Sequence, residues 1–234
     1  MNKLNISLIC AALLAVLLTA CSENSSSSEP EYVFDASVVC PAEGLNAYGE
    51  PNRGTFIDER DGRTYKYTTI GNQVWMAENL KIEADQSQCL KEIENYCDSV
   101  GRFYISAPLR QEHDVRKWLA TICPSGWHVP SVLEWDSLFT NMGSDAKGLL
   151  RLQSTTVFEN VIPGTDDCAF NILPMAVGLE KPEDPKKNYK YISPYFATST
   201  FFDLISLYSF YINTKVYYVR STIDYSFIRC IKNN

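Results

Sequence analysis

The eight cysteines of this chain constrain its fold more than any other feature of the sequence. Two of them, Cys10 and Cys21, lie within or just after an apolar N-terminal segment that has the features of an export signal. The remaining six form an even set, and beyond the cytoplasmic membrane such sets pair as disulfides. Spacing alone leaves the pairing open, although the short polar loop CLKEIENYC indicates a local bridge. The six are Cys40, Cys89, Cys97, Cys123, Cys168 and Cys230.

The export signal occupies residues 1–20. Lys3 supplies a positive charge, an uncharged apolar run extends from Ile6 to Ala20, and small residues precede Cys21. The run is about 15 residues long, shorter than the roughly 20 that a membrane-spanning helix needs. The last four residues, LTAC at 18–21, resemble the bacterial lipobox, in which the cysteine is lipidated on sulfur and becomes the first residue after cleavage. We therefore predict a lipoprotein anchored through Cys21; the alternative is an ordinary secreted protein.

A polar segment follows the predicted lipidation site. Residues Ser22 to Glu31, SENSSSSEPE, contain no large apolar side chain and cannot bury enough surface to become ordered. We expect residues 21–50, which include Cys40, to form a flexible tether, and residues 51–234 to form one folded domain.

The charge balance argues against nucleic acid as a partner. The whole chain has 21 basic and 28 acidic side chains, and loss of Lys3 with the signal leaves 20 minus 28, a net charge of −8. Binding to nucleic acid requires a positive surface. No later segment is apolar over a membrane-spanning length, so we expect the lipid alone to attach the protein to the membrane.

The predicted domain begins with strands that are separated by turns. The stretches GTFID, RTYKYTTI and QVWMAENL are rich in aromatic and β-branched residues, and Asp61-Gly62 and Gly71-Asn72 lie between them. Dipeptides of this kind between alternating segments predict two consecutive hairpins.

Two helices are predicted in the middle of the chain. In QEHDVRKWLATI, at 111–122, four apolar side chains fall on one helical face. A second helix begins at Ser131, whose hydroxyl can cap it while Glu134 reaches back. The buried faces consist of Val115, Trp118, Leu119 and Ile122 in the first helix, and Val132, Trp135, Leu138, Phe139 and Met142 in the second.

The last third of the chain changes to loops and strands. Glu180 to Lys190 combines charges with two prolines and predicts an exposed loop. The stretches LYSFYI, KVYYVR and YSFIRCI, between Tyr195 and Ile231, predict strands. Strands, then helices, then loops and strands indicate an α+β fold.

Four short motifs follow one another from about residue 55 to the C-terminus. They are FIDERDGRTY at 56–65, IGNQVWMAENL at 70–80, CPSGWHVPS at 123–131 with Glu134-Trp135, and FIRC at 227–230. Their sequences and their order resemble the Fibrobacter succinogenes major paralogous domain, which closes with S-V-R-C. The resemblance is far more specific than a single short pattern.

The resemblance implies a C-type-lectin-like fold on exported, often lipid-anchored proteins, without an established catalytic activity. It also implies a disulfide pairing. Cys89 and Cys97 match the local pair of the family, and Cys123 of CPSGWH would bond to Cys230 of FIRC, which leaves Cys40 and Cys168 to each other.

The chain departs from the family pattern at two places in its late region. FATST at 196–200 stands where the family usually has W-S-S-T, and CAFNILP at 168–174 replaces the usual G-F-x-x-L-P. Cys168 therefore lies near an expected glycine, and Cys40 lies before the usual start of the domain. Because both cysteines depart from the family pattern, we expect them to form a bridge that is specific to this chain.

Five side chains are candidates for contact with a ligand: Trp75, Glu78, Asn79, Trp127 and His128. His128 could act as a general base if a nucleophile approached it. The competing interpretation places Trp127 and His128 in a tight turn packed under the second helix, and has Glu78 and Asn79 satisfy backbone groups at a strand end. We favour these structural roles and predict no catalytic residue, because no G-x-S-x-G elbow accompanies a Ser-His-Asp set.

No metal or cofactor is predicted. Zinc sites normally draw on close C-x2-C pairs, which this sequence lacks. Glu50-Pro51-Asn52 spells the E-P-N of mannose-binding C-type lectins, but it precedes the first strand and no W-N-D accompanies it, so we interpret it as a coincidence. Asp166 and Asp167 could still supply oxygen ligands, with weak support.

The leading functional hypothesis is a non-catalytic binding or adhesion module for a polysaccharide or an envelope protein. Aromatic residues between Tyr189 and Tyr225 could stack on such a ligand, although sheet core is the favoured interpretation for them. One alternative is an enzyme of the formylglycine-generating type, which shares a C-type-lectin-like core but needs a reactive C-x4-C pair that is missing here. The other alternative is an inert structural envelope protein. Because Ser22 is not an inner-membrane retention aspartate, we expect the outer membrane and a head that faces the periplasm or the cell surface.

Overall fold

The computed structural model describes residues 32–233 apart from short interruptions. The predicted signal 1–20, the lipidation site Cys21 and the tether Ser22–Glu31 lie outside the described residues, as does most of the predicted loop that begins at Glu180. None of the described helices is long and apolar enough to cross a membrane. The interruptions fall at 86, 91–92, 106–111, 144–145, 159–160, 179–188, 204–205, 213–215 and 222–224.

Two consecutive hairpins form one side of a five-stranded sheet, as predicted. Strands β1 (Arg53–Asp58), β2 (Arg63–Ile70) and β3 (Gln73–Met76) pair antiparallel. Gly62 and Gly71 occupy the turns with φ of 71° and 59°, a conformation that glycine adopts without a steric penalty. The sheet continues in the order β1-β2-β3-β13-β6. Its last two strands are β13 (Ile231–Lys232) and β6 (Trp127–His128), so the chain end returns beside the first hairpins.

Helices α4 (Glu112–Ile122) and α5 (Val132–Met142) confirm both predicted helices. The Ser131 hydroxyl accepts from the Glu134 backbone N–H, and the Glu134 carboxylate accepts from the Ser131 N–H, which completes the capping box. The predicted apolar faces are buried except at Val132, which is half-buried. A short helix, α6 (Ala146–Leu150), follows α5.

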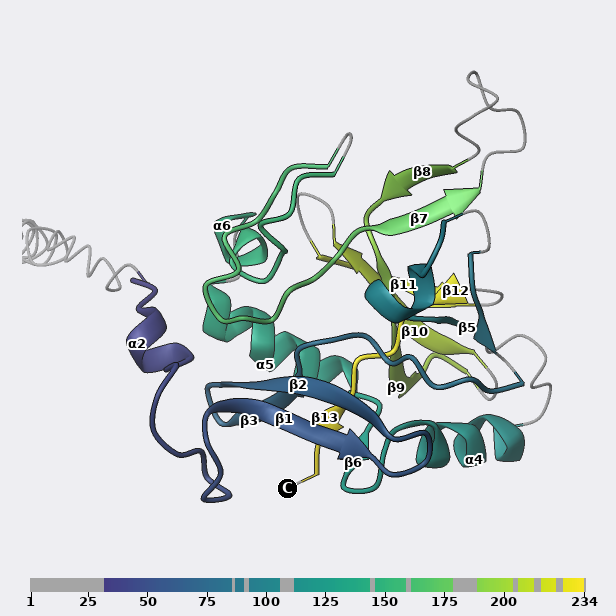
Figure 1. The fold of residues 1–234 in the computed structure, drawn as a ribbon, viewed down its shortest axis with the longest axis horizontal. Coiled ribbons are helices and arrows are strands. Elements are labelled where there is room, and N and C mark those ends of the chain that lie inside the picture. The colour runs from purple at the N-terminus through teal and green to yellow at the C-terminus, as the bar shows by residue number, and fades with distance from the viewer. Residues whose placement is uncertain are drawn as a thin grey trace, which may run out of the picture. The chain divides into compact units, whose positions relative to one another are not determined.

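Three smaller sheets complete the α+β architecture (Figure 1). One has the order β11-β10-β9, another β12-β5-β4, and the third pairs β7 with β8. LYSFYI forms β10 and the described part of KVYYVR lies in β11, as predicted. YSFIRCI divides into β12 and β13, because the residues between them pass from one sheet to another. The strands are β4 (Ser87–Gln88), β5 (Phe103–Ile105), β7 (Met175–Gly178), β8 (Tyr189–Ile192), β9 (Tyr195–Phe201), β10 (Leu207–Ile212), β11 (Val216–Ser221) and β12 (Tyr225–Ser226).

Aromatic side chains fill the main core. Trp135 on α5 lies 4.5 Å from Trp75 on β3 and 4.4 Å from Phe210 on β10, measured between ring centroids. Phe196, which stands where the family usually has a tryptophan, is fully buried and stacks on Phe210. Burial of each such ring away from water contributes roughly 2 kcal/mol to the stability of the fold. A second cluster joins α4 to the sheet through Tyr65, Met76, Val115, Leu119 and Ile228.

The structure contains the three disulfides that the resemblance implied: Cys40–Cys168, Cys89–Cys97 and Cys123–Cys230. The first and third join residues 128 and 107 positions apart, and the second joins residues 8 apart. Cys123 follows α4 and Cys230 precedes β13, so this bridge ties the helical part to the last strand.

The compact unit of the structure begins at Phe34, before the domain boundary predicted at residue 51. A four-residue helix, α2 (Ala36–Val39), leads into Cys40, which is buried and bonded to Cys168. The last carbonyl of α2 also accepts from the Gly71 N–H at 2.7 Å. The disulfide and this backbone contact hold a segment that the predicted boundary had placed in the tether.

Candidate functional site

Three of the five candidate ligand contacts lie around the end of β3. Trp75 is fully buried in the aromatic core and Asn79 is 2% exposed, so the structure removes both from the set that a ligand can reach. Glu78 is half-buried: its Oε2 accepts from the Lys66 N–H at 2.7 Å, and its Oε1 lies 2.8 Å from Lys81 Nζ. These contacts are the structural roles that the competing interpretation assigned to Glu78 and Asn79.

Asn79 is one half of a buried polar pair with Arg229. The guanidinium donates from Nε and Nη2 to Asn79 Oδ1 at 3.1 and 2.7 Å, and from Nη1 to the Phe170 carbonyl. Asn79 in turn donates from Nδ2 to the Val100 carbonyl at 2.9 Å. Burial lowers the pKa of Arg229 to about 9. The pair joins the motif at 70–80 to the closing FIRC motif. The sequence indicated both motifs but not the contact between them.

Trp127 and His128 form the edge strand β6. The Trp127 ring stacks on Phe56 with centroids 4.5 Å apart. His128 Nε2 lies 2.8 Å from Glu134 Oε1, and its Nδ1 lies 2.7 Å from Asn233 Oδ1. The histidine side chain is 39% exposed, so it sits at the surface rather than inside the turn where we expected it. The hydrogen bond to Glu134 raises the pKa of His128 above its ordinary value.

The group around His128 is arranged as a helix cap. Ser131 Oγ donates to Glu134 Oε2 at 2.8 Å, while His128 bonds to the other oxygen of the same carboxylate. In nucleophilic catalysis the hydroxyl and its base lie within hydrogen-bond reach of each other. Here the Ser131 hydroxyl and the His128 ring are each hydrogen-bonded to Glu134 instead. This geometry therefore stabilises the start of α5 and aligns no nucleophile with a base.

The acidic residues considered as metal ligands are used within the fold. Asp166 Oδ1 accepts from the Asn171 N–H at 2.7 Å, and burial raises the Asp166 pKa. In the E-P-N sequence, Glu50 pairs with Lys232 at 2.5 Å, and Asn52 is buried and donates to the Glu43 carbonyl. Across the described residues, no group of three His, Cys, Asp or Glu side chains is placed to hold a metal ion.

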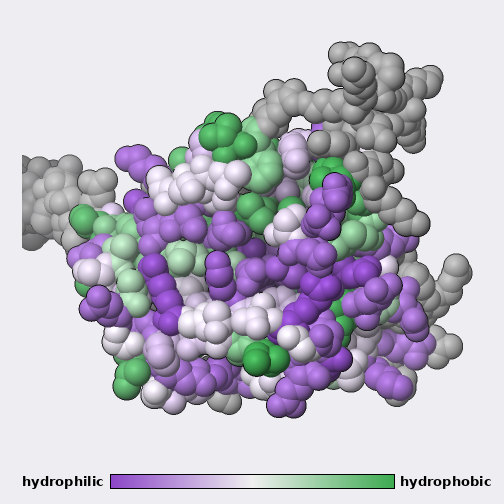
Figure 2. Space-filling model, in the orientation of Figure 1, coloured by the Kyte–Doolittle hydropathy of each residue, from purple (hydrophilic) through white to green (hydrophobic). Residues whose placement is uncertain are grey.

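A pocket of about 470 Å³ opens where β4, β5, β7, β9 and β12 meet. Figure 2 shows hydrophobic residues exposed among hydrophilic ones on the visible face of the molecule, including near the place where Figure 1 draws β7. The described residues of its wall are uncharged, and aromatic rings come from three of the five strands. The wall consists of Gln88, Cys89, Leu90, Phe103, Met175, Ala176, Val177, Gly178, Tyr195 and Tyr225.

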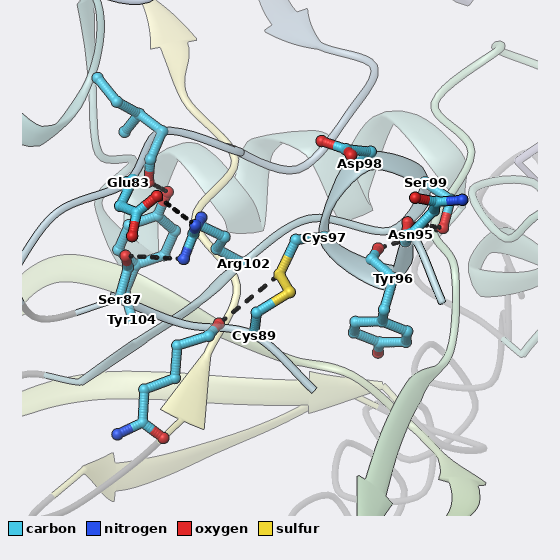
Figure 3. Close-up of a disulfide and its surroundings, with 12 residues drawn as sticks. Glu83, Ser87, Cys89, Asn95, Tyr96, Cys97, Asp98, Ser99, Arg102 and Tyr104 are labelled. Atoms are coloured by element: carbon cyan, nitrogen blue, oxygen red, sulfur yellow. Dashed lines mark hydrogen bonds and ion pairs between the residues drawn. A yellow bond between two sulfur atoms is a disulfide. The ribbon is translucent and has the colours of Figure 1, made fainter. Parts of the chain in front are cut away.

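A disulfide and a tyrosine hydroxyl hold one wall of the pocket. Figure 3 shows this disulfide, between Cys89 and Cys97, and the neighbouring Tyr96. Cys89 in the wall is bonded to Cys97 in the short helix α3 (Tyr96–Ser99). The first residue of α3, Tyr96, is buried, and its hydroxyl oxygen accepts from the Ala176 N–H at 2.8 Å. Because Ala176 belongs to β7, α3 is joined both to β7 and, through the disulfide, to Cys89 beside β4. These two parts of the wall come from different sheets.

Sequence reasoning did not find this pocket. Of its wall residues, it singled out Cys89 as a disulfide partner and placed Tyr195 and Tyr225 in a stretch of aromatic strands. The wall draws on segments near residues 88, 103, 176, 195 and 225, and no local pattern connects them. The only available signal was the aromatic richness of the last third of the chain.

Comparison with known proteins gives one match. The family model for the Fibrobacter succinogenes major domain matches residues 68–232, which extend from the end of β2 to β13 and include the whole described wall of the pocket. No curated protein and no solved structure matches the chain.

Proposed function

We propose that this chain, which belongs to the Fibrobacter succinogenes major domain family, is a lipid-anchored envelope protein whose head binds a ligand. Cys21 carries the lipid, and Ser22–Glu31 form the flexible tether. The head has a C-type-lectin-like fold and holds a polysaccharide or an envelope protein without changing it chemically. Two helices, antiparallel strands and the bridge from the helical part to the last strand support that fold.

The pocket beside β7 is the observation that carries the binding role. Its volume of about 470 Å³ falls within the range of pockets that take small ligands. Tyr225 at the pocket is 48% exposed, so about half of its surface is accessible from solvent. Aromatic side chains with one apolar and one wet end are typical of binding surfaces.

The chemistry of the wall favours binding over catalysis. The described wall residues offer one amide, two phenols and a disulfide sulfur, together with aliphatic and aromatic groups. General acid–base and nucleophilic catalysis usually depend on imidazole, carboxylate, amine or thiol groups. The described part of the head holds its six cysteines in disulfides, whereas the formylglycine-generating reaction requires reactive thiols. The proposal therefore keeps the non-catalytic role.

The binding role is tested with the full chain in which Cys21→Ser prevents acylation. We expect the protein to retain a component of glycan arrays or of envelope extracts, and Tyr225→Ala to reduce that retention. Phe202→Ala is the matched control, because Phe202 is also 48% exposed and lies outside the pocket wall. Equal retention by the two variants would contradict a role for the pocket, and no retention by the parent protein would favour a structural role.

The anchor and the position of the head are tested in cells. Metabolic labelling with a palmitate analogue should mark the parent protein and leave Cys21→Ser unlabelled. An outer-membrane head that faces outward is cleaved when intact cells are treated with protease. Protection of the head in intact cells, followed by cleavage after permeabilisation, would place it in the periplasm instead.

A further inference from the structure

We infer that the pocket accepts an uncharged aromatic ring that carries one hydrogen-bonding group, such as a phenol or an indole. The inference rests on the proposed binding function and names the chemical class of its ligand. The ring can belong to a side chain of a protein partner or to a free small molecule, since both present the same chemistry to the wall.

The absence of charge among the described wall residues opposes a charged ligand. A charged group that enters an apolar pocket loses hydration, and it regains that energy only from an opposite charge or from several hydrogen bonds. The described wall supplies neither a basic nor an acidic side chain. A neutral ligand loses less hydration energy on entry.

The distribution of polar groups in the wall favours a ring over a sugar. A sugar carries a hydroxyl on most of its carbons, and each buried hydroxyl needs a partner. The side chains of the described wall offer hydrogen-bonding groups at Gln88, Tyr195 and Tyr225, and the other side chains are apolar apart from the disulfide sulfur. One or two ligand polar groups can be satisfied by this set, while the apolar remainder of the wall suits an aromatic face.

The rings already present show how another ring would pack. Tyr225 meets Phe103 edge to face, with centroids 6.4 Å apart and planes at 83°. Aromatic pairs prefer such edge-to-face or offset arrangements. Tyr225 remains 48% exposed after this contact, so much of its surface is still available for a second ring. Phe103 is buried and fixes the position of the edge that Tyr225 approaches.

The size of the pocket sets the size of the ligand. An apolar cavity of about 150 Å³ is enough to hold benzene. The pocket measures about 470 Å³, which leaves room for a ring with its substituent and a short connecting chain. A phenol or indole at the end of a flexible side chain meets this limit.

The part of the wall that β7 and Cys89 form is fixed before a ligand arrives. The Ala176 N–H is bonded to the Tyr96 hydroxyl, and α3 is joined to Cys89 by the disulfide to Cys97. Preorganisation of this kind reduces the entropy that binding would otherwise cost. The backbone amides of β7 are therefore suitable reporters of occupancy.

The test is a titration of the isotopically labelled full chain with Cys21→Ser, followed by the amide NMR signals of Ala176, Val177 and Gly178. The probes are p-cresol, N-acetyltyrosine methylamide, methyl glucoside and 4-hydroxybenzoate. We expect the first two to shift these amides to saturation, and the sugar and the charged ring to leave them unmoved. Preference for the tyrosine amide over p-cresol would indicate a protein side chain as the source, and the opposite order a free small molecule.

Two variants and one control complete the test. Tyr225→Ala should weaken p-cresol binding about tenfold, the upper end of what one aromatic contact contributes. Val177→Phe should weaken binding, because the larger side chain occupies part of the pocket, and Phe202→Ala should leave binding unchanged. Saturable shifts from methyl glucoside alone would overturn the aromatic class and leave the binding function standing. If no probe shifts the β7 amides, the aromatic inference is overturned, while the retention experiment judges the binding function separately.

Discussion

The end of the five-stranded sheet and the pocket beside β7 use their side chains in opposite ways. Around β3 and β6, the polar residues that attract attention in the sequence are bonded to one another: Asn79 to Arg229, Glu78 to Lys81, and His128 to Glu134. Around the pocket, the described wall residues are uncharged and an aromatic ring is left partly exposed. The comparison teaches that side chains of a catalytic type can be engaged in holding a fold, while a pocket can form from residues that belong to no recognisable motif.

The largest expected effect is the loss of stability when a disulfide is removed, and this loss differs between the two regions. Replacing Cys123 and Cys230 together by serine removes a bridge that spans 107 residues. The chain-entropy model gives a loss of about 4–5 kcal/mol in the free energy of unfolding. The same change at Cys89 and Cys97, which are 8 residues apart, should cost only about 2–3 kcal/mol. Urea denaturation measures both, and equal losses would mean that the short bridge does more than close its own loop.

The second effect concerns the buried pair at the sheet end. Asn79→Ala removes the acceptor of two guanidinium hydrogen bonds and should cost about 3 kcal/mol, because a buried charge loses its partner. Asn141→Ala is the control, since Asn141 is half-buried and donates to a carbonyl of its own helix. Urea unfolding should show a loss below about 1 kcal/mol for the control. A small loss at Asn79 would mean that water or another carbonyl takes over the guanidinium.

The third effect is a pH dependence confined to the sheet end. The hydrogen bond to Glu134 raises the pKa of folded His128, so its stabilisation is fully present below the unfolded pKa of about 6.5. That stabilisation is lost as the pH rises through the folded pKa. Because the histidine is 39% exposed, solvent screening limits the change to about 1 kcal/mol or less.

His128→Gln tests this pH dependence. Urea midpoints of the parent protein at pH 6 and pH 8.5 should differ more than those of the variant. Glu134 stays ionised at both values, since hydrogen bonds from His128 and Ser131 outweigh the effect of burial and hold its pKa below its ordinary value. Parallel pH profiles for parent and variant would show that the pair contributes nothing measurable.

The smallest effect belongs to the pocket. Tyr225→Ala and Phe202→Ala should each change the free energy of unfolding by less than about 1 kcal/mol, because both side chains are half exposed. Thermal unfolding measures this directly. A much larger loss for Tyr225→Ala would assign the tyrosine to the core and weaken its role as a ligand contact.

Local chemistry explains which elements could be predicted. The hairpins follow from turn dipeptides that need glycine at positive φ, and α5 follows from a capping box within four residues of sequence. The apolar faces of both helices follow from a 3.6-residue period. Each of these signals lies within one element, so the rest of the chain does not need to be known.

The failed and missing predictions have a different origin. Residues 34–50 were assigned to the tether because they precede the first recognisable strand and motif, yet Cys40 in this segment is bonded to Cys168, more than a hundred residues later. Trp75 and Asn79 were predicted as candidate ligand contacts, but both side chains are buried in the folded protein. In each case the deciding contact joins segments that are distant in sequence, and composition has no access to it.

The sequence by itself determined the α+β class, the two hairpins, the two long helices and, through its motifs, the family and the disulfide pairing. Only the tertiary structure decided where residues 34–50 belong, which polar side chains are occupied, and that a pocket exists. The physical reason is that periodicity and capping act between near neighbours. Burial and cavity shape instead depend on which strands come together, and the pocket needs five of them.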